Sequence, residues 1–280
     1  MTGAPATTAA TSARDRAAAT YGVVAVRYAE RETTLNEAFY RWATYGEPDG
    51  PLRMAYYFWL LEPPSGPPVV VDCGFDPPVG ARMGRRCLVE PADALARLGV
   101  DGAAVRHVIL THLHYDHVGN VGLFPGAQLV VAQRELDFWT SPIARREHFA
   151  QHADADAVAA VARAAAEGRV RAVDDALEVA AGIDALVVGG HSPGQLLVSV
   201  KAPGDRRVLL ASDAVHYEDE LRTERPFAVL ADLAGVYRAY DTVRALRDAG
   251  HAIVAGHDPL VWERHPRLEG PGAEIAVRIA

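Results

Sequence analysis

Apolar residues recur in two patterns along the chain, and these patterns mark the predicted elements. Short runs rich in valine, leucine and tyrosine predict strands, at residues 22–28, 54–61, 69–71, 106–110, 127–132, 170–173, 177–179, 185–188, 198–200, 208–211 and 251–255. Apolar residues three or four positions apart predict amphipathic helices, at residues 91–98, 134–139 and 233–246. Both halves of the chain therefore combine strands with helices, which predicts a mixed fold.

Two further segments, residues 1–20 and residues 142–168, have compositions that differ from those of the predicted strands and helices. Residues 1–20 are mostly small or polar and lack an apolar period, so we expect a flexible N-terminal tail followed by a single domain over residues 21–280. Residues 142–168 are rich in alanine and charged side chains and predict a helical stretch, which would form a lid or a dimer contact. Within that stretch, the spacing of His148 and His152 favours an exposed helix surface over a metal site.

The candidate chemistry begins with Thr-His-Leu-His-Tyr-Asp-His-Val-Gly-Asn at residues 111–120, directly after an apolar run. Alternating residues of an extended loop point to the same side, so His112 and His114 would bind one ion. Asp116 and His117 would face a neighbouring position. Imidazole and carboxylate without thiolate suit Zn²⁺ first, with Mn²⁺, Fe²⁺ or Co²⁺ as alternatives.

Three further candidate ligands follow three separate predicted strands. His191 lies in Gly-Gly-His-Ser-Pro-Gly, Asp213 in Ala-Ser-Asp and His257 in Ala-Gly-His-Asp. An adventitious histidine-rich turn would have no such partners. The sequence therefore predicts one convergent metal site.

These motifs resemble the metallo-β-lactamase superfamily from about Met54 to about Pro259. The run His-Leu-His-Tyr-Asp-His matches its HxHxDH motif, and Gly-His-Ser-Pro-Gly matches its GH[ST]PG turn. Val-Asp-Cys-Gly at residues 71–74 resembles its VDTG element, with Cys73 in place of threonine. The resemblance implies an α+β fold, the αββα sandwich, with two metal ions at one edge of the sheets.

The same resemblance implies how the ligands divide. One zinc ion would take His112, His114 and His191, the second would take Asp116, His117 and His257, and Asp213 would bridge them beside a shared hydroxide. Two cations lower the pKa of that water, and one of them polarises a substrate carbonyl. The expected activity is hydrolysis of a small molecule.

Within the superfamily the chain is most similar to the N-acyl-homoserine lactonases, which are quorum-quenching enzymes. The similarity lies in the amino-acid sequence of residues 110–120, in the Ala-Gly-His-Asp-Pro motif near the end of the matching region and in the overall length. In that group the hydroxide opens a lactone ring, and a tyrosine three residues after the bridging aspartate stabilises the oxyanion. This chain has His216 at that place and Tyr217 one later, so Tyr217 is the first candidate for this contact and His216 is the alternative, with Asp116 as the proton carrier.

A substrate pocket for an acyl chain would need apolar walls. Aromatic side chains that could supply them, although each taken alone is more typical of the core, are Phe39, Trp42, Tyr45, Trp139, Phe149 and Phe227. Related enzymes cleave other esters, thioesters as glyoxalase II does, ethers or amides, and these alternatives stay open. A non-catalytic metal-binding protein would be expected to have lost ligands, and none is missing here.

The composition of the chain argues against two classes of binding partner, nucleic acids and membranes. The net charge of −8 and the single lysine, Lys201, argue against binding to nucleic acid. No apolar run approaches the roughly 20 residues needed to span a bilayer, and no signal peptide opens the chain, so we expect a cytoplasmic protein without a membrane partner. Cys73 and Cys87 are expected to be reduced. The resemblance also suggests a homodimer.

Overall fold

The computed structural model describes residues 19–280 and contains two β-sheets. Strands of the larger sheet are β1 (Gly22–Thr34), β2 (Pro51–Glu62), β3 (Val69–Val71), β4 (Arg86–Cys87), β5 (His107–Ile109), β6 (Gln128–Ala132), β7 (Val170–Val173) and β13 (Ala276–Arg278). Its order is β13-β1-β2-β3-β5-β6-β7, and β4 pairs with β1. The smaller sheet contains β8 (Ala176–Ala180), β9 (Ile183–Val187), β10 (Leu196–Lys201), β11 (Arg207–Ser212) and β12 (His251–Ala255), in the order β12-β11-β10-β9-β8.

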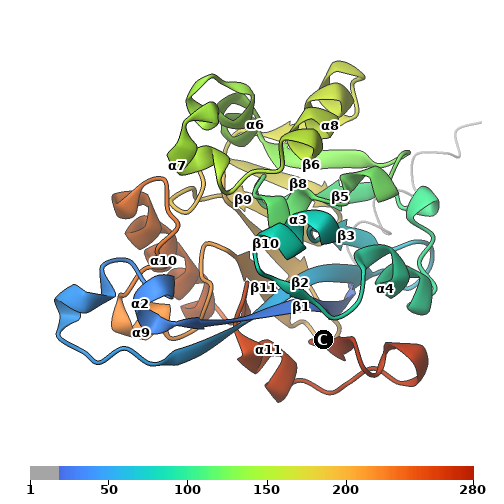
Figure 1. Ribbon diagram of the computed structural model, residues 1–280. Coiled ribbons are helices and arrows are strands. Elements are labelled where there is room, and N and C mark those ends of the chain that lie inside the picture. The colour runs from blue at the N-terminus through green and yellow to red at the C-terminus, as the bar shows by residue number, and fades with distance from the viewer. Residues whose placement is uncertain (1–18) are drawn as a thin grey trace, which may run out of the picture.

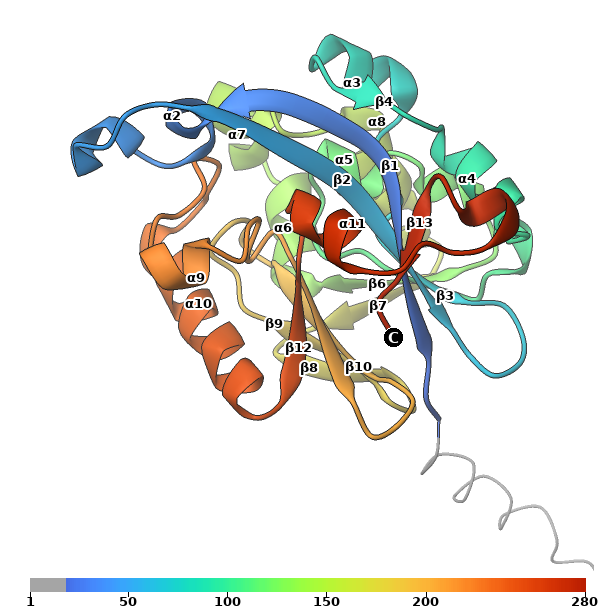
Figure 2. The ribbon, with the colours of Figure 1, turned by 90° about the horizontal axis from the view of Figure 1, so that it is seen from below.

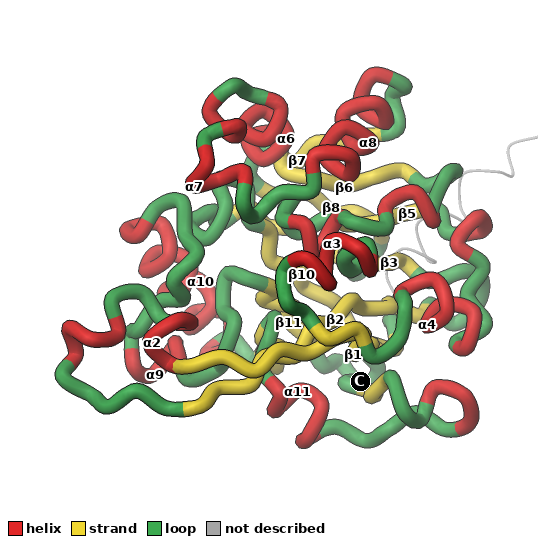
Figure 3. Tube along the Cα trace, in the orientation of Figure 1, coloured by secondary structure: helices red, strands yellow, loops and turns green. Residues whose placement is uncertain are grey.

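Helices surround the two sheets, as Figures 1 and 3 show. They are α2 (Leu35–Ala38), α3 (Pro77–Arg82), α4 (Pro91–Arg97), α5 (Tyr115–Val118), α6 (Gln133–Thr140), α7 (Glu147–Ala150), α8 (Ala155–Ala166), α9 (Glu220–Thr223), α10 (Leu233–Asp248) and α11 (Pro259–Arg264). Helix α10 lies along the outer side of the smaller sheet, beside β12 (Figure 2). In the part of the chain that is described, no helix is long and apolar enough to cross a bilayer.

The alternating side chains of β2 show how the layers are joined. Tyr57 and Trp59 point into the core shared by the two sheets, whereas Tyr56 and Phe58 point to the opposite face, towards the helices of the larger sheet. Side chains alternate in the same way along β11. Leu210 points into the shared core, and the residues on either side of it pack against α10. The layers are helix, sheet, sheet and helix, which confirms the predicted αββα sandwich.

The predicted strands and the three predicted amphipathic helices are present, with shifted ends. Strand β1 continues to Thr34, so β1 and β2 form a long hairpin that carries α2 at its tip (Figure 1). Residues 142–168 are not one helix, because Asp154 accepts hydrogen bonds from the amides of Asp156 and Ala157 and so begins a separate helix, α8. The predicted tail lies outside the described residues except for residues 19 and 20. Cys73 and Cys87 are free thiols, as predicted.

Candidate metal centre

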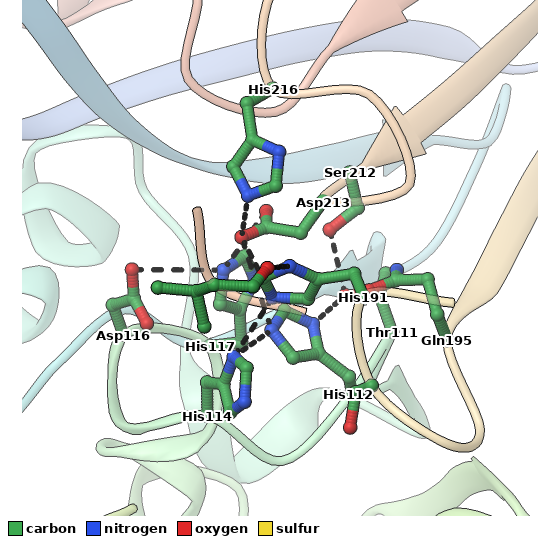
Figure 4. Close-up of polar contacts among 12 residues, drawn as sticks. Thr111, His112, His114, Asp116, His117, His191, Gln195, Ser212, Asp213 and His216 are labelled. Carbon is green, nitrogen blue, oxygen red and sulfur yellow. Dashed lines mark hydrogen bonds and ion pairs between the residues drawn. The ribbon is translucent and has the colours of Figure 1, made fainter. Parts of the chain in front are cut away.

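All the predicted metal ligands lie at the ends of strands of both sheets. The loop after β5 supplies His112 and His114, and α5 begins within the same motif and carries Asp116 and His117. The smaller sheet supplies His191 between β9 and β10, Asp213 after β11 and His257 after β12. Figure 4 shows most of these side chains pointing toward one another around Asp213. Each of them is buried.

Three imidazoles converge on one point. His114 Nδ1 lies 3.0 Å from His112 Nε2 and 2.9 Å from His191 Nε2. The outer nitrogens are already engaged: His112 Nδ1 contacts Thr111 Oγ1 at 3.2 Å, and His191 Nδ1 donates to Val229 O at 2.8 Å. Burial lowers the pKa of all three imidazoles well below the usual value, so they stay neutral. Their inner nitrogens therefore present lone pairs, as a metal ligand must.

Asp213 lies at the centre of the second group. Its Oδ1 is 3.3 Å from His117 Nε2, and its Oδ2 is 3.2 Å from His257 Nε2 and 3.4 Å from His191 Nε2. Asp116 Oδ2 is 3.8 Å from the Nε2 atoms of both His117 and His257. Burial alone would raise the pKa of Asp213, but the adjacent His257, His117 and His216 hold it well below the usual value.

The donor set fits metal ions. His117 Nε2 and Asp213 Oδ1 are buried and have no hydrogen-bond partner in the described part of the chain, although such atoms are costly to leave unsatisfied. Four overlapping groups of three side chains have ligand atoms close enough together to hold a metal ion, and three of the four groups include His117 or Asp213. Nitrogen and oxygen donors in two adjoining groups are the coordination that two zinc ions prefer.

A buried aspartate supports this cluster from behind. Asp72 accepts hydrogen bonds from the backbone amide and the hydroxyl of Thr111, both at 2.8 Å, and from His117 Nδ1 at 2.7 Å. Its φ of 60° is left-handed, a conformation that aspartate tolerates better than most residues do. Asp72 therefore fixes the ring orientation of His117. It lies in the Val-Asp-Cys-Gly element that resembles the family.

Glu135 of α6 is a second buried support, which the sequence alone did not predict. Its carboxylate accepts hydrogen bonds from Leu113 N at 3.0 Å, Ser192 Oγ at 2.5 Å and Gly194 N at 2.6 Å, as well as from Trp139 Nε1. It thus joins the loop of His112 and His114 to the turn of His191. A glutamate in a short amphipathic helix is normally solvated, so no sequence signal marked it.

A cavity of about 130 Å³ opens onto the ligands. His114, Asp116, His191, Asp213 and His257 form its metal-binding side. Its other polar side chains, which we call the cavity wall, are Arg31, Glu37, Tyr56, Arg85, Tyr115 and His152. This volume is small compared with the ligand pockets of about 300 Å³ or more that hold drug-sized molecules.

The predicted aromatic wall is only partly present. Phe227 lines the cavity. Trp139 and Phe149 flank a narrow cleft beside His114 and His191.

The other three predicted aromatic residues lie outside the cavity. Phe39 packs on Trp42 with ring centroids 5.5 Å apart, and Trp42 packs on Tyr45 at 6.1 Å. Arg225 covers Tyr45 from 4.7 Å. Phe39 and Trp42 are part of the core cluster on the helix side of the larger sheet, and Tyr45 packs at its exposed edge.

The structure also separates the two candidates for substrate contact. Tyr217 donates its hydroxyl hydrogen to Arg53 O at 3.2 Å and lines a different surface groove. His216 Nε2 lies 3.1 Å from Asp213 Oδ2, and its ring stacks on Phe227 at 3.8 Å. The consecutive side chains point in different directions after β11, so Tyr217 is not brought to the cavity. His216 is buried and does not line the cavity, but it contacts Asp213 and orients it.

Burial lowers the pKa of His216, but Asp213 and Glu220 outweigh burial and raise it to about 9. A protonated imidazole here would donate to the Asp213 carboxylate.

His152 also differs from the prediction. It follows α7, lies only 5.6 Å from the His114 ring and belongs to the cavity wall, whereas His148 is exposed.

Fold and site together define a class of protein, an αββα sandwich with a cluster of potential metal ligands where strands of the two sheets end. Residues 53–257 match the model of the Metallo-beta-lactamase superfamily, and the chain belongs to that superfamily.

The chain is also similar to proteins that are named lactonases. The chain is 28% identical to the N-acyl homoserine lactonase AttM of Azorhizobium caulinodans over 192 residues, which are 62% of this chain and 65% of the relative. It thus spans less than two-thirds of the length of that relative.

Solved structures show the same fold. A quorum-quenching N-acyl homoserine lactone hydrolase superposes with a TM-score of 0.69 at 20% identity, covering 88% of this chain and 95% of that one. The dizinc quorum-quenching lactonase AidC, in complex with a product, superposes with a TM-score of 0.66 at 16% identity, covering 86% and 91%.

Proposed function

We propose that this protein is a dinuclear zinc hydrolase that opens a lactone ring, with N-acyl-homoserine lactones among the candidate substrates. The observation that carries the proposal is the convergence of imidazole nitrogens and a central carboxylate on a cavity, with the outer nitrogens of His112, His117, His191 and His257 already engaged. Similarity to proteins named lactonases supports the choice of reaction.

The ligands divide between two positions. His112, His114 and His191 would hold one ion, Asp116, His117 and His257 would hold the other, and Asp213 would contact both. Zinc ions bound there would supply a Lewis acid for the substrate carbonyl and a water molecule acidic enough to attack at neutral pH. The same donors would also accept Mn²⁺, Fe²⁺ or Co²⁺.

Asp116 is the residue of this chain best placed to move a proton. Its backbone oxygen is held by the hydroxyl of Tyr28 at 2.9 Å, and its carboxylate lines the cavity. No hydrogen bond to that carboxylate occurs among the described residues. With a metal ion bound by one carboxylate oxygen, the other oxygen would be free to receive a proton and return it to the leaving alcohol.

The test is acid release by the zinc-loaded protein from a panel of lactones, including short-chain and long-chain N-acyl-homoserine lactones. We expect turnover that stops on chelation and returns with zinc. A protein that binds two metal ions and opens no lactone would contradict the proposal. Esters, thioesters, ethers and amides in the same panel identify another hydrolase, whereas no turnover on any of them indicates a metal-binding protein without catalysis.

A homodimer and a cytoplasmic location are also part of the proposal. Light scattering of the purified protein tests the first, and cell fractionation with an antibody tests the second.

A further inference from the structure

One cation of the cavity wall has no carboxylate of its own. Arg85 lies between α3 and β4 and is half-buried. Its Nε donates to the hydroxyl oxygen of Tyr115 at 2.9 Å, and its Nη1 donates to Met83 O at 2.6 Å. Nη2 makes no hydrogen bond to the described residues. Arg31, the other cation of the wall, differs because it pairs with Glu37 at 3.0 Å.

A guanidinium that is partly removed from water normally has a counter-ion, because a neutral phenol and a carbonyl do not cancel its charge. Among the described residues no carboxylate lies within ion-pair distance of Arg85. Apart from the phenols of Tyr56 and Tyr115, the acidic group that acts on Arg85 through space is Asp116. That carboxylate is a proposed metal ligand, and a bound divalent cation would offset its charge. The positive charge at this side of the cavity therefore remains uncompensated.

Tyr56 fixes the distance between this charge and the metal ligands. Arg85 Cζ lies 5.9 Å from the Tyr56 ring centroid, and that ring meets the His257 ring edge-on at 4.8 Å. One tyrosine ring thus separates the guanidinium from a ligand. A molecule with its carbonyl at the metal side would bring a substituent only a few bonds away to Arg85, and the cavity of about 130 Å³ has room for a compact molecule.

We propose that Arg85 binds an anionic substituent of the substrate, so that the preferred substrate is a small lactone that carries a carboxylate. This inference rests on the proposed lactonase function. A guanidinium suits the purpose because it stays charged, and its unused Nη2 can donate to a carboxylate oxygen in a charge-assisted hydrogen bond. Long uncharged acyl chains fit the same cavity poorly.

The test compares 5-oxotetrahydrofuran-2-carboxylate with its uncharged carboxamide. In the wild-type protein we expect kcat/KM to favour the carboxylate by about 10- to 100-fold. Arg85→Gln should reduce that preference to about 1, mainly through KM, and Arg85→Lys should keep part of it. Arg82→Gln is the matched control, because Arg82 is exposed at the end of α3. A structural role for Arg85 would lower both activities equally and leave the preference unchanged, which would overturn the proposal.

Calorimetry with glutarate, which contains no bond to hydrolyse, separates this inference from the lactonase proposal. We expect glutarate to bind the zinc-loaded protein at least about 10-fold more weakly in Arg85→Gln than in Arg82→Gln. If no lactone is opened but glutarate binding depends on Arg85, the lactonase proposal fails and the anion site stands. If both variants bind glutarate equally, the anion site is refuted whatever lactones are opened.

Discussion

The two sides of the metal centre are built differently. Behind the ligands, Asp72 and Glu135 are fully buried, and each accepts hydrogen bonds from several donors. On the cavity wall, Arg85 and His152 are only half-buried, and Arg85 keeps an unused donor. The rear side holds the imidazoles in one orientation, which metal binding requires. On the cavity wall, Arg85 Nη2 has no partner among the described residues, and this is the donor that the proposed anion site would use.

Replacing the central carboxylate should have the largest effect. In Asp213→Ala we expect hydrolysis to fall by at least about 10³-fold, because both proposed ions would lose a ligand and the charge between them would be uncompensated. Metal content after dialysis should fall below two ions per chain. Asp248→Ala, on the exposed end of α10, is the matched control and should keep both ions. Full metal content together with full activity in Asp213→Ala would remove the proposed centre.

Zinc affinity should be more sensitive to a charge change behind the ligands than to one on the cavity wall. Asp72→Asn keeps a residue that tolerates the left-handed backbone but removes the charge that orients His117. We expect zinc affinity to weaken by about 10- to 100-fold, measured by competition with a chromophoric chelator. An unchanged affinity would show that His117 is oriented without Asp72.

Glu135→Gln tests whether the two ligand loops depend on one carboxylate. An amide nitrogen would face one of the four donors now bound by Glu135, so we expect a loss of about 1–3 kcal/mol in the free energy of unfolding. The d–d spectrum of the cobalt-loaded protein should also shift, since a loss of stability alone would not move it. Glu178→Gln is the control, because Glu178 is exposed on β8. A spectrum identical to that of the wild type would make Glu135 only a packing residue.

The smallest effect is expected at Tyr217. Tyr217→Phe removes a hydroxyl that bonds Arg53 O away from the cavity, so kcat should change by less than about 2-fold and stability by about 1 kcal/mol. Steady-state kinetics and thermal unfolding measure the two quantities. If turnover instead slowed by about 100-fold, as the loss of an oxyanion donor would cause, Tyr217 would be a substrate contact after all and the chain after β11 would have a different arrangement.

The sequence predicted the strands and the clustering of the candidate metal ligands because both depend on local patterns. A ligand motif such as His-Leu-His-Tyr-Asp-His occupies adjacent positions, and the remaining ligands follow apolar strands whose ends meet at one edge. The cavity wall depends instead on which distant turns approach one another. Arg85 is one of several scattered arginines until its Nε is seen on Tyr115, a contact across 30 residues of chain.

Tyr217 shows a different limit. Its closeness in sequence to Asp213 could not reveal its side-chain direction, because one residue in an irregular segment changes the face that a side chain occupies. Glu135 was missed for a related reason. Its four donors come from three separate segments, and only the folded chain brings them together.

His257 connects the two sheets through its backbone oxygen and its ring, both of which bond to the backbone of β2. Ala55 of β2 donates its amide hydrogen to His257 O at 3.0 Å and accepts from His257 Nδ1 at 2.9 Å. A strand of the larger sheet therefore orients a candidate ligand that follows the smaller sheet. An ion bound by His257 would strengthen the contact between the two sheets at this seam, the line where they meet. Its removal should loosen this seam while each sheet keeps its own pairing, and amides along the seam would then exchange with solvent deuterium before those at the centre of either sheet.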